Sequence, residues 1–182
     1  YDSDAYSWPT AVTSDGRFVI FDKISRANQQ DILMLDLESR SVDVVAGSRF
    51  WEGNGAVSPD DRWLAYESDE TGRKEVYLRP LASDAGRVLV SDGGGELPVW
   101  SRQGDRLFFR QDDRIMVVDV DLNGPDAALG RQESFVAGVA AGRSTTAAAD
   151  AFDVSDDGSR LLMSLRDPDV NSGAHLGAVF GF

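Results

Sequence analysis

The fold is decided by the stretch Ser58-Pro59-Asp60-Asp61-Arg62-Trp63-Leu64-Ala65-Tyr66. Its pattern of a hydroxyl residue, a short turn and an apolar run occurs four times along the chain. The copies begin at Thr13, Ser58, Ser101 and Ser155, with spacings of 45, 43 and 54 residues. A period of this length indicates a repeat architecture, in which each copy is one supersecondary unit that buries its apolar surface against its neighbours.

Each copy predicts two strands joined by a tight turn. Glycine occupies the same turn position in three copies, at Gly16, Gly104 and Gly158, and Asp61 replaces it in the second. Glycine adopts a positive φ without a clash, and aspartate is among the few residues that tolerate this conformation. The hydroxyl before the turn can bond to the turn amides. The apolar run that follows is continuous rather than alternating, which indicates a strand covered on both faces.

Two more strands are predicted in each repeat. The third strand is expected at 31–37, 75–81 and 114–120, and the fourth at 41–45, 87–90 and 134–136. Pro80 has no N–H group, so we expect it near a strand end or a sheet edge. Four strands in about 43 residues are typical of β-propeller blades. We therefore predict an all-β propeller segment of four-stranded antiparallel blades, one domain over 1–182, with blades near 1–47, 48–92, 93–139 and an incomplete 140–182.

The stretch quoted above, followed by Glu75–Pro80, resembles the TolB-like (WD-like) β-propeller repeat of bacterial proteins. Pro98–Val120 is similar to the penultimate blade of such propellers, and Phe152–Met163 to the last. The resemblance implies six blades as the commonest closed form, free in the periplasm, attached to receptor-like serine/threonine kinases or placed before peptidase domains. Three arrangements stay open for this chain: the C-terminal part of a larger propeller, a small four-bladed ring, or self-association or closure by a partner chain through open blade edges.

The composition excludes several classes of protein. The 182 residues include 31 acidic and 18 basic side chains, for a net charge of −13. Nucleic acid and anionic membranes are therefore not expected partners, because phosphate binding needs a basic face. There is also no apolar run of the roughly 18 residues that a membrane insertion would need. Without cysteine the chain has neither a thiolate nucleophile nor disulfides.

No catalytic residue or cofactor is predicted. His175 is the single histidine, and no G-x-S-x-G motif supplies a serine for it to activate. A hydrolase or lyase that uses the carboxylates of Glu96 and Asp153 is not favoured, because nothing in the sequence pairs these two groups.

A weak calcium motif begins at the end of a predicted third strand. Asp119, Asp121 and Asn123 match the first half of a D-x-D-x-N-G loop, but the twelfth position is Gly130 instead of the bidentate glutamate. We therefore interpret the segment as a structural turn, and we predict no metal site. A second D-x-D-x-N run at 167–171 is interpreted as a solvated loop for the same reason.

The candidate binding residues lie in the connections between blades. Tyr6 and Trp51 each stand seven residues before an anchor hydroxyl, and Asn54 and Glu96 lie in the same kind of connection. The run Gly53-Asn54-Gly55 is interpreted as a sharp turn before a first strand. Such connections gather near the channel mouth of a propeller, and aromatic residues on a rigid scaffold are favourable contact residues.

The leading functional hypothesis is a non-enzymatic binding, scaffold or sensor module that contacts a protein or peptide through loops of the channel face. Acidic loops favour a basic partner or a cation. The alternative is a regulatory or gating segment of a larger enzyme, a peptidase or receptor-like serine/threonine kinase, with its catalytic domain outside this chain. The resemblance implies a periplasmic or other extracytoplasmic location, with the cytoplasm as the alternative.

Overall fold

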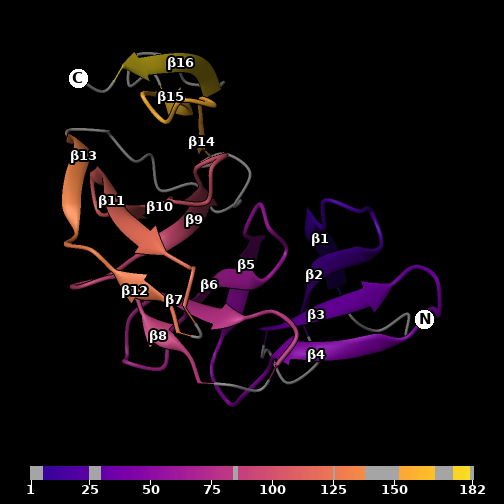
Figure 1. Cartoon of the computed structure of the whole chain (residues 1–182). Coiled ribbons are helices and arrows are strands. Elements are labelled where there is room, and N and C mark those ends of the chain that lie inside the picture. Colours follow the sequence, from indigo (N-terminus) through magenta and orange to yellow (C-terminus); the bar gives the residue numbers. More distant parts are fainter. Residues whose placement is uncertain are drawn as a thin grey trace. The chain divides into compact units, whose positions relative to one another are not determined.

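The computed structural model describes residues 6–24, 30–83, 86–124, 126–137, 152–166 and 174–180, with side chains described as far as Met163. These residues form strands and turns without a helix, and the strands group into four antiparallel sheets (Figure 1). The prediction of an all-β chain made of repeated antiparallel sheets is confirmed. Among the described residues there is no helix that could span a membrane.

The first two sheets have the four strands that the repeat predicts, in chain order. The first sheet consists of β1 (Tyr6–Val12), β2 (Phe18–Ile24), β3 (Gln30–Asp36) and β4 (Val42–Ala46). The second sheet consists of β5 (Glu52–Val57), β6 (Trp63–Ser68), β7 (Glu75–Pro80) and β8 (Val88–Leu89). Trp63–Tyr66 of β6 are buried, as their continuous apolar run predicts, and Glu67 and Ser68 of the same strand are buried too. Pro80 ends β7.

The third sheet differs from the four-stranded expectation, whereas the fourth was predicted to be incomplete. The third sheet consists of β9 (Glu96–Trp100), β10 (Arg106–Gln111), β11 (Arg114–Asp121), β12 (Ala128–Leu129) and β13 (Glu133–Ala137). Both β12 and β13 pair with the same edge of the long strand β11, at its end and at its start. The fourth sheet has three described strands, namely β14 (Phe152–Val154), β15 (Arg160–Arg166) and β16 (Ala174–Phe180).

The repeated turn has the conformation that its residues predict. Asp61 has a φ of 58°, close to the 69° of Gly16 at the same repeat position. The anchor hydroxyl closes the turn, because the Oγ1 of Thr13 accepts the N–H of Phe18 at 2.9 Å. The hydroxyls of Ser58, Ser101 and Ser155 accept the corresponding N–H at 3.0 Å each. Recurrence in all four repeats shows that these hydroxyl groups are structural.

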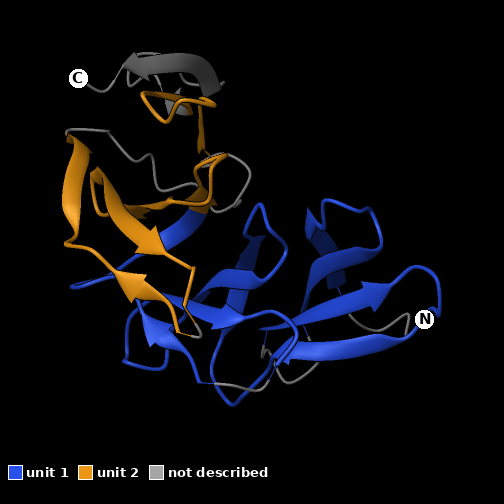
Figure 2. Cartoon of the chain, in the orientation of Figure 1, with its two compact units in different colours: residues 1–98 blue, residues 99–182 orange. Residues whose placement is uncertain are grey.

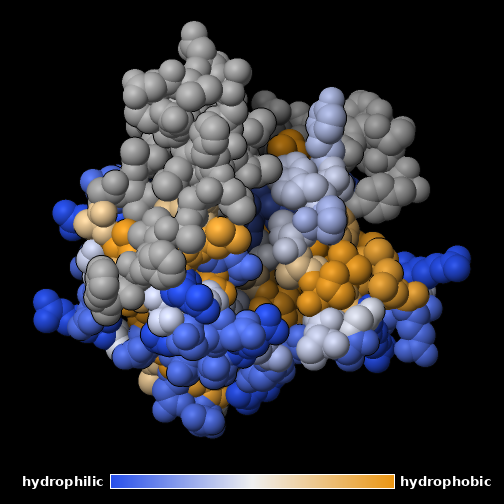
Figure 3. All heavy atoms as spheres, turned by 90° about the horizontal axis from the view of Figure 1, so that it is seen from above, coloured by the Kyte–Doolittle hydropathy of each residue, from blue (hydrophilic) through white to orange (hydrophobic). Residues whose placement is uncertain are grey.

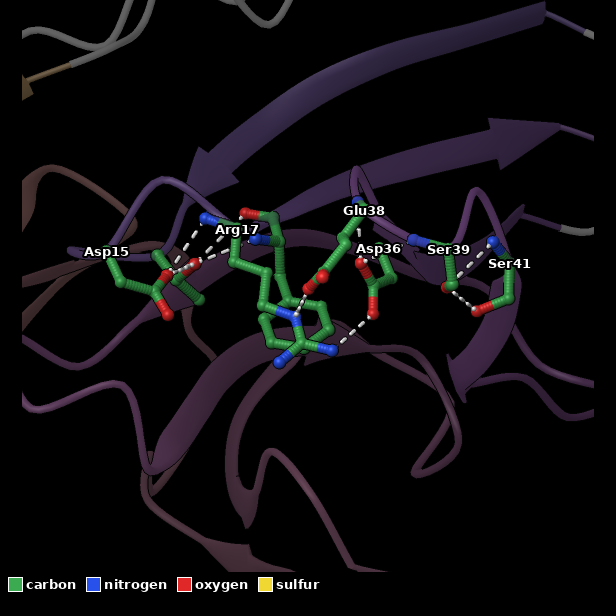
Figure 4. A network of polar contacts seen from close by, with 8 residues as sticks. Asp15, Arg17, Asp36, Glu38, Ser39 and Ser41 are labelled. Atoms are coloured by element: carbon green, nitrogen blue, oxygen red, sulfur yellow. Dashed lines mark hydrogen bonds and ion pairs between the residues drawn. The ribbon is translucent and has the colours of Figure 1, made fainter.

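A polar network holds the hairpin between β3 and β4 (Figure 4). Asp36 ends β3, and its Oδ1 accepts the backbone N–H groups of Glu38 at 2.8 Å and Ser39 at 3.2 Å. Its Oδ2 lies 2.8 Å from Nη2 of Arg17, at the start of the neighbouring hairpin. These contacts, led by the hydrogen bond from Arg17, lower the pKa of Asp36 to about 2.

The chain divides into two compact units, 1–98 and 99–182, and the boundary falls inside β9 (Figure 2). In the first unit the hydrophobic core lies between the first and second sheets. It includes Ile20 and Ile32 from the first sheet and Leu64 and Tyr66 from the second. The innermost packing is close, since a Cβ at Gly55 would lie 3.3 Å from both isoleucines. The domain bounds of 1–182, and the four blade bounds, stay a prediction.

A candidate functional site at the start of strand β5

Each of the first two sheets has one buried carboxylate that bonds to the first strand of the next sheet. Asp22 in β2 and Glu67 in β6 both stand nine residues after an anchor hydroxyl, and both are fully buried. Asp22 Oδ2 accepts the N–H of Asn54 at 2.9 Å, and Glu67 Oε1 accepts the N–H of Leu97 at 2.6 Å. Asn54 and Leu97 occupy one repeat position as well, with φ of 53° and 55°. The same carboxylate-to-backbone contact is therefore used twice.

Side chains complete this polar cluster. The amide Nε2 of Gln30 donates to Asp22 Oδ2 at 2.8 Å, and Nδ2 of Asn54 donates to Glu67 Oε1 at 2.7 Å. The ammonium group of Lys74 lies 2.9 Å from Glu67 Oε2 and neutralises this buried charge. Asn54 therefore contacts both carboxylates, one through its backbone and one through its side chain.

The run Gly53-Asn54-Gly55 lies inside β5, so the prediction of a turn before the strand is wrong. A bulge between Gly53 and Ala56 lets the strand include the left-handed Asn54 and then continue its pairing with β6. A Cβ at Gly53 would lie 2.1 Å from Nε2 of Gln30, so a larger residue there would displace the amide that bonds to Asp22. The glycines serve close packing and strand geometry in the polar cluster.

Burial dominates the electrostatics of the cluster. It raises the pKa of Asp22 to about 6, against the lowering effect of the Asn54 hydrogen bond, and the nearby charge of Glu67 adds to the rise. Burial also raises the pKa of Glu67, which Lys74 partly counteracts. Asp22 Oδ1 is buried and accepts no hydrogen bond from any of the described residues. The cluster is therefore easier to protonate than an exposed pair of carboxyl groups.

The polar cluster extends to Trp51, immediately before β5. The ammonium nitrogen of Lys74 lies 4.1 Å from the centre of the Trp51 ring, which is a cation–π contact. The backbone N–H of Trp51 donates to Asp69 Oδ1 at 2.9 Å. These contacts fix a half-buried aromatic ring at the start of the strand.

Tyr6 begins β1, which is the strand equivalent to β5. The residue Tyr6 is 81% exposed. Tyr6 and Trp51 therefore occupy the same end of equivalent strands within the first unit. Asn54 is half-buried, with its amide group turned to Glu67 instead of solvent. Glu96 begins β9 and is half-buried. Their role in binding stays a prediction.

Sequence reasoning missed the partners that hold this site, namely Asp22, Gln30, Glu67 and Lys74. The signal for two of them was present, because an acidic residue stands nine positions after the anchor in the first two repeats. The third and fourth repeats have Arg110 and Ser164 there, which hid the regularity.

The weak calcium motif contains a closed turn. Asp121 Oδ1 accepts the backbone N–H of Asn123 at 3.0 Å and its side-chain Nδ2 at 2.8 Å. These two bonds lower the pKa of Asp121. Asp119 and Asp121 line an open hollow of about 410 Å³ together with Asp105. In the described parts of the chain no three carboxylate or histidine side chains gather as metal ligands.

The remaining candidates contribute little to a site. Asp153 is exposed in β14 and accepts the N–H of Val154 at 2.8 Å. His175 lies in β16, whose side chains are outside the described part of the chain. The run 167–171 lies entirely outside the described residues.

Antiparallel sheets of this size, repeated along the chain and packed face to face in the first unit, define a segment of a β-propeller. Solved structures with the same fold include TolB proteins and a peptidase. No protein-family model and no curated protein sequence matches the chain.

Three solved structures illustrate the likeness. TolB from Acinetobacter baumannii has a TM-score of 0.68 at 15% identity, over 98% of this chain and 41% of that one. A proposed TolB from Agrobacterium tumefaciens has a TM-score of 0.56 at 19% identity, over 76% and 53%. A puromycin-hydrolyzing peptidase from Mycobacterium tuberculosis has a TM-score of 0.68 at 16% identity, over 97% and 30%. The chain thus spans about half or less of the TolB structures, and the likeness concerns the fold.

Proposed function

We propose that this chain is a non-enzymatic binding or scaffold module that contacts a protein or peptide at the end of the first unit where β1 and β5 begin. The observation that carries the proposal is the pair of aromatic residues at this end, Tyr6 and Trp51. Tyr6 is 81% exposed, and Trp51 is held by Lys74 and Asp69. An exposed aromatic and a preorganised one, at the same end of equivalent strands, offer contact area at low entropic cost.

Charge determines the chemistry of the proposed partner. With a net charge of −13, the chain attracts basic segments and repels acidic ones at low ionic strength. A basic peptide with an aliphatic or aromatic residue would satisfy both the acidic surface and the rings. The location that fits the TolB-like fold best is extracytoplasmic, and it is part of the proposal.

The proposal is tested by selecting peptides from a random displayed library against the whole chain. The dissociation constants of the selected peptides are then measured for three variants: Tyr6→Ala, Trp51→Ala and the control Leu89→Ala. Leu89 is an exposed apolar residue of β8, away from the proposed face. We expect the first two substitutions to weaken binding about tenfold or more, and the control to leave it unchanged.

Circular dichroism of each variant shows whether its fold is intact. Peptides that bind Tyr6→Ala and Trp51→Ala as tightly as the unchanged chain contradict the proposed face. Binding that is lost equally with Leu89→Ala contradicts it too, because the contact would then be general hydrophobic adhesion.

The second candidate function is a gating segment of a larger enzyme. The observation in its favour is the likeness to a peptidase structure, of which the chain covers 30%. A gene that encodes a hydrolase or kinase domain in the same polypeptide would favour it over the free binding module. Weak peptide binding by the isolated chain, together with such a domain, would decide for the gating role.

A further inference from the structure

The first sheet has an apolar outer face on the side opposite the second sheet. Val19 pairs with Leu35, and Phe21 pairs with Leu33, so these four side chains point to one side of the sheet. The alternate residues Ile20 and Ile32 pack in the core with the second sheet. Around Val19, Phe21 and Leu35 the surface forms an open, mainly apolar hollow of about 250 Å³. Figure 3 shows hydrophobic side chains gathered on the side of the molecule where Figure 1 draws this sheet.

The internal repeat shows what covers the equivalent face elsewhere. Leu64 and Tyr66 of the second sheet stand six and eight residues after their anchor, as Val19 and Phe21 do. Both are buried in the core that the second sheet shares with the first. In this repeat, the face that carries these positions is thus covered by the sheet that comes before it in the chain.

Exposure at a third position agrees with this comparison. Leu37 and Leu81 are equivalent residues just after the third strand of their sheets. Leu81 belongs to the core between the sheets and is 7% exposed, whereas Leu37 is 51% exposed. On this face Val19 and Leu35 are half-buried and Leu37 is half exposed, whereas Phe21 and Leu33 are 7% and 8% exposed. The part of the interface that lacks a covering sheet therefore lies around Val19, Leu35 and Leu37.

We propose that the outer face of the first sheet is a docking surface for one more four-stranded sheet of the same repeat, which precedes residue 1 in the same polypeptide. The internal repeat supports this occupant, since a preceding sheet covers the equivalent face of the second sheet. The chain also spans 53% and 41% of the two TolB structures that it resembles, so comparable propellers contain further sheets. This inference is independent of the proposed binding function.

The interface predicts the chemistry of the covering sheet. Aliphatic residues are expected at its positions equivalent to Ile20 and Ile32, which fill the space against Leu64. An acidic residue is not expected at the position of Asp22. Its acceptor role needs an N–H four residues before the next anchor, and the first sheet has Pro9 there. A buried carboxylate without that donor would be costly, so a neutral residue is expected.

A second copy of this chain is a less favourable occupant. Each copy carries a net charge of −13, so two copies repel each other before any contact forms. Association of two copies is therefore a distinct outcome of the test.

The absence of cysteine makes the face easy to probe. Val19→Cys places one thiol on the outer face, and Leu89→Cys places one on the second sheet as a matched control. The rate of modification by a maleimide is measured in the 182-residue chain and in the longer product of its gene, which includes the coding sequence upstream of Tyr1. We expect the Val19→Cys thiol to react at least about tenfold more slowly in the longer product, and the Leu89→Cys thiol to react equally in both.

The upstream sequence itself is part of the test. An anchor serine or threonine is expected about 45 residues before Thr13, followed by an aliphatic residue seven positions later and a neutral one nine positions later. Equal reaction rates of Val19→Cys in the two products would overturn the proposal, as would an upstream sequence without this repeat. A third outcome would also overturn the proposal, because it would make a second copy the occupant. In it, the Val19→Cys thiol of the 182-residue chain reacts more slowly as the protein concentration rises, and adding Phe21→Asp removes this protection.

Discussion

At the scale of single residues, Asp61 shows how one side chain meets two demands of the repeat. Its φ of 58° is that of a glycine, and its carboxylate reaches the neighbouring turn, where it accepts the backbone N–H of Ser14 at 2.9 Å and 3.0 Å. Glycine at this position, as in Gly16, satisfies the backbone but makes no such contact between turns. Aspartate thus tolerates the left-handed conformation and bonds the second sheet to the first.

Comparing Asp61→Gly with Asp61→Ala separates these two demands. Both substitutions remove the bonds to Ser14, but alanine also has to place a Cβ in the left-handed region. We expect Asp61→Ala to be less stable than Asp61→Gly by about 1–2 kcal/mol in urea unfolding at pH 7. Equal stability of the two variants would show that the turn relaxes to another conformation.

Asp22 predicts a dependence of stability on pH. Its pKa is about 6 in the folded chain and 3.8 in an exposed aspartate. The folded state therefore binds this proton more tightly, and the resulting stabilisation is complete below about pH 4 and is lost as the pH rises through 6. We expect Asp22→Asn, which stays neutral, to raise the free energy of unfolding at pH 8 by roughly 2–3 kcal/mol, and to change it little at pH 4.

The measurement is urea unfolding of both proteins at pH 4, 6 and 8. Asp43→Asn is the matched control, because Asp43 is an exposed carboxylate in β4 of the same sheet. Its effect should be small and the same at each pH. If Asp22→Asn destabilises the chain equally at pH 4 and pH 8, the pKa of Asp22 is not raised in the folded chain and the expected gain is absent.

At the scale of strands, β5 is the element that both packs the core and carries the polar cluster. Gly55 faces the first sheet, and a Cβ there would lie 3.2 Å from Leu64 and 3.3 Å from Ile20. We expect Gly55→Ala to destabilise the chain by about 1–3 kcal/mol through overpacking. Gly86→Ala is the control, since a Cβ at Gly86 meets no atom within 4 Å. Thermal unfolding that shifts equally for both variants would contradict close packing of β5.

The same scale shows what the sequence could predict. Continuous apolar runs located β2, β6, β10 and β15, because a strand buried on both faces needs no polar alternation. The two-residue strand β12 was missed, since Ala128-Leu129 is too short to carry a period and pairs only because β11 is long. The start of β5 was misplaced because a bulge, rather than a loop, accommodates its glycines.

The polar cluster could not be predicted from the sequence, for a different reason. Asp22 and Glu67 are 45 residues apart, and each alone is typical of a solvated strand end. Their burial depends on how two sheets pack, and neither turn signals nor apolar periods report that packing. Tyr6 and Trp51 were identified from their spacing to the anchors, but the contact of Trp51 with Lys74 required the structure.

At the scale of the whole molecule, each sheet is stabilised mainly by the sheets that cover it, as in other repeat architectures. One repeat position illustrates this in two environments. Ile20 and Leu162 both stand seven residues after an anchor, in the first and the fourth sheet. Ile20 is fully buried against the second sheet, whereas Leu162 is 45% exposed. Identical places in the repeat thus differ in what covers them.

The two positions therefore predict unequal effects of the same truncation. We expect Ile20→Ala to lower the free energy of unfolding by about 2–5 kcal/mol, because it removes buried methyl groups and leaves a cavity between two sheets. Leu162→Ala removes as many carbon atoms from a side chain that water already reaches, so the expected loss is about 0.5–1 kcal/mol. Urea unfolding followed by tryptophan fluorescence measures both. If Leu162→Ala lowers the free energy of unfolding as much as Ile20→Ala does, the fourth sheet is covered in solution. The position of Leu162 in the repeat, rather than its exposure, would then set its contribution to stability.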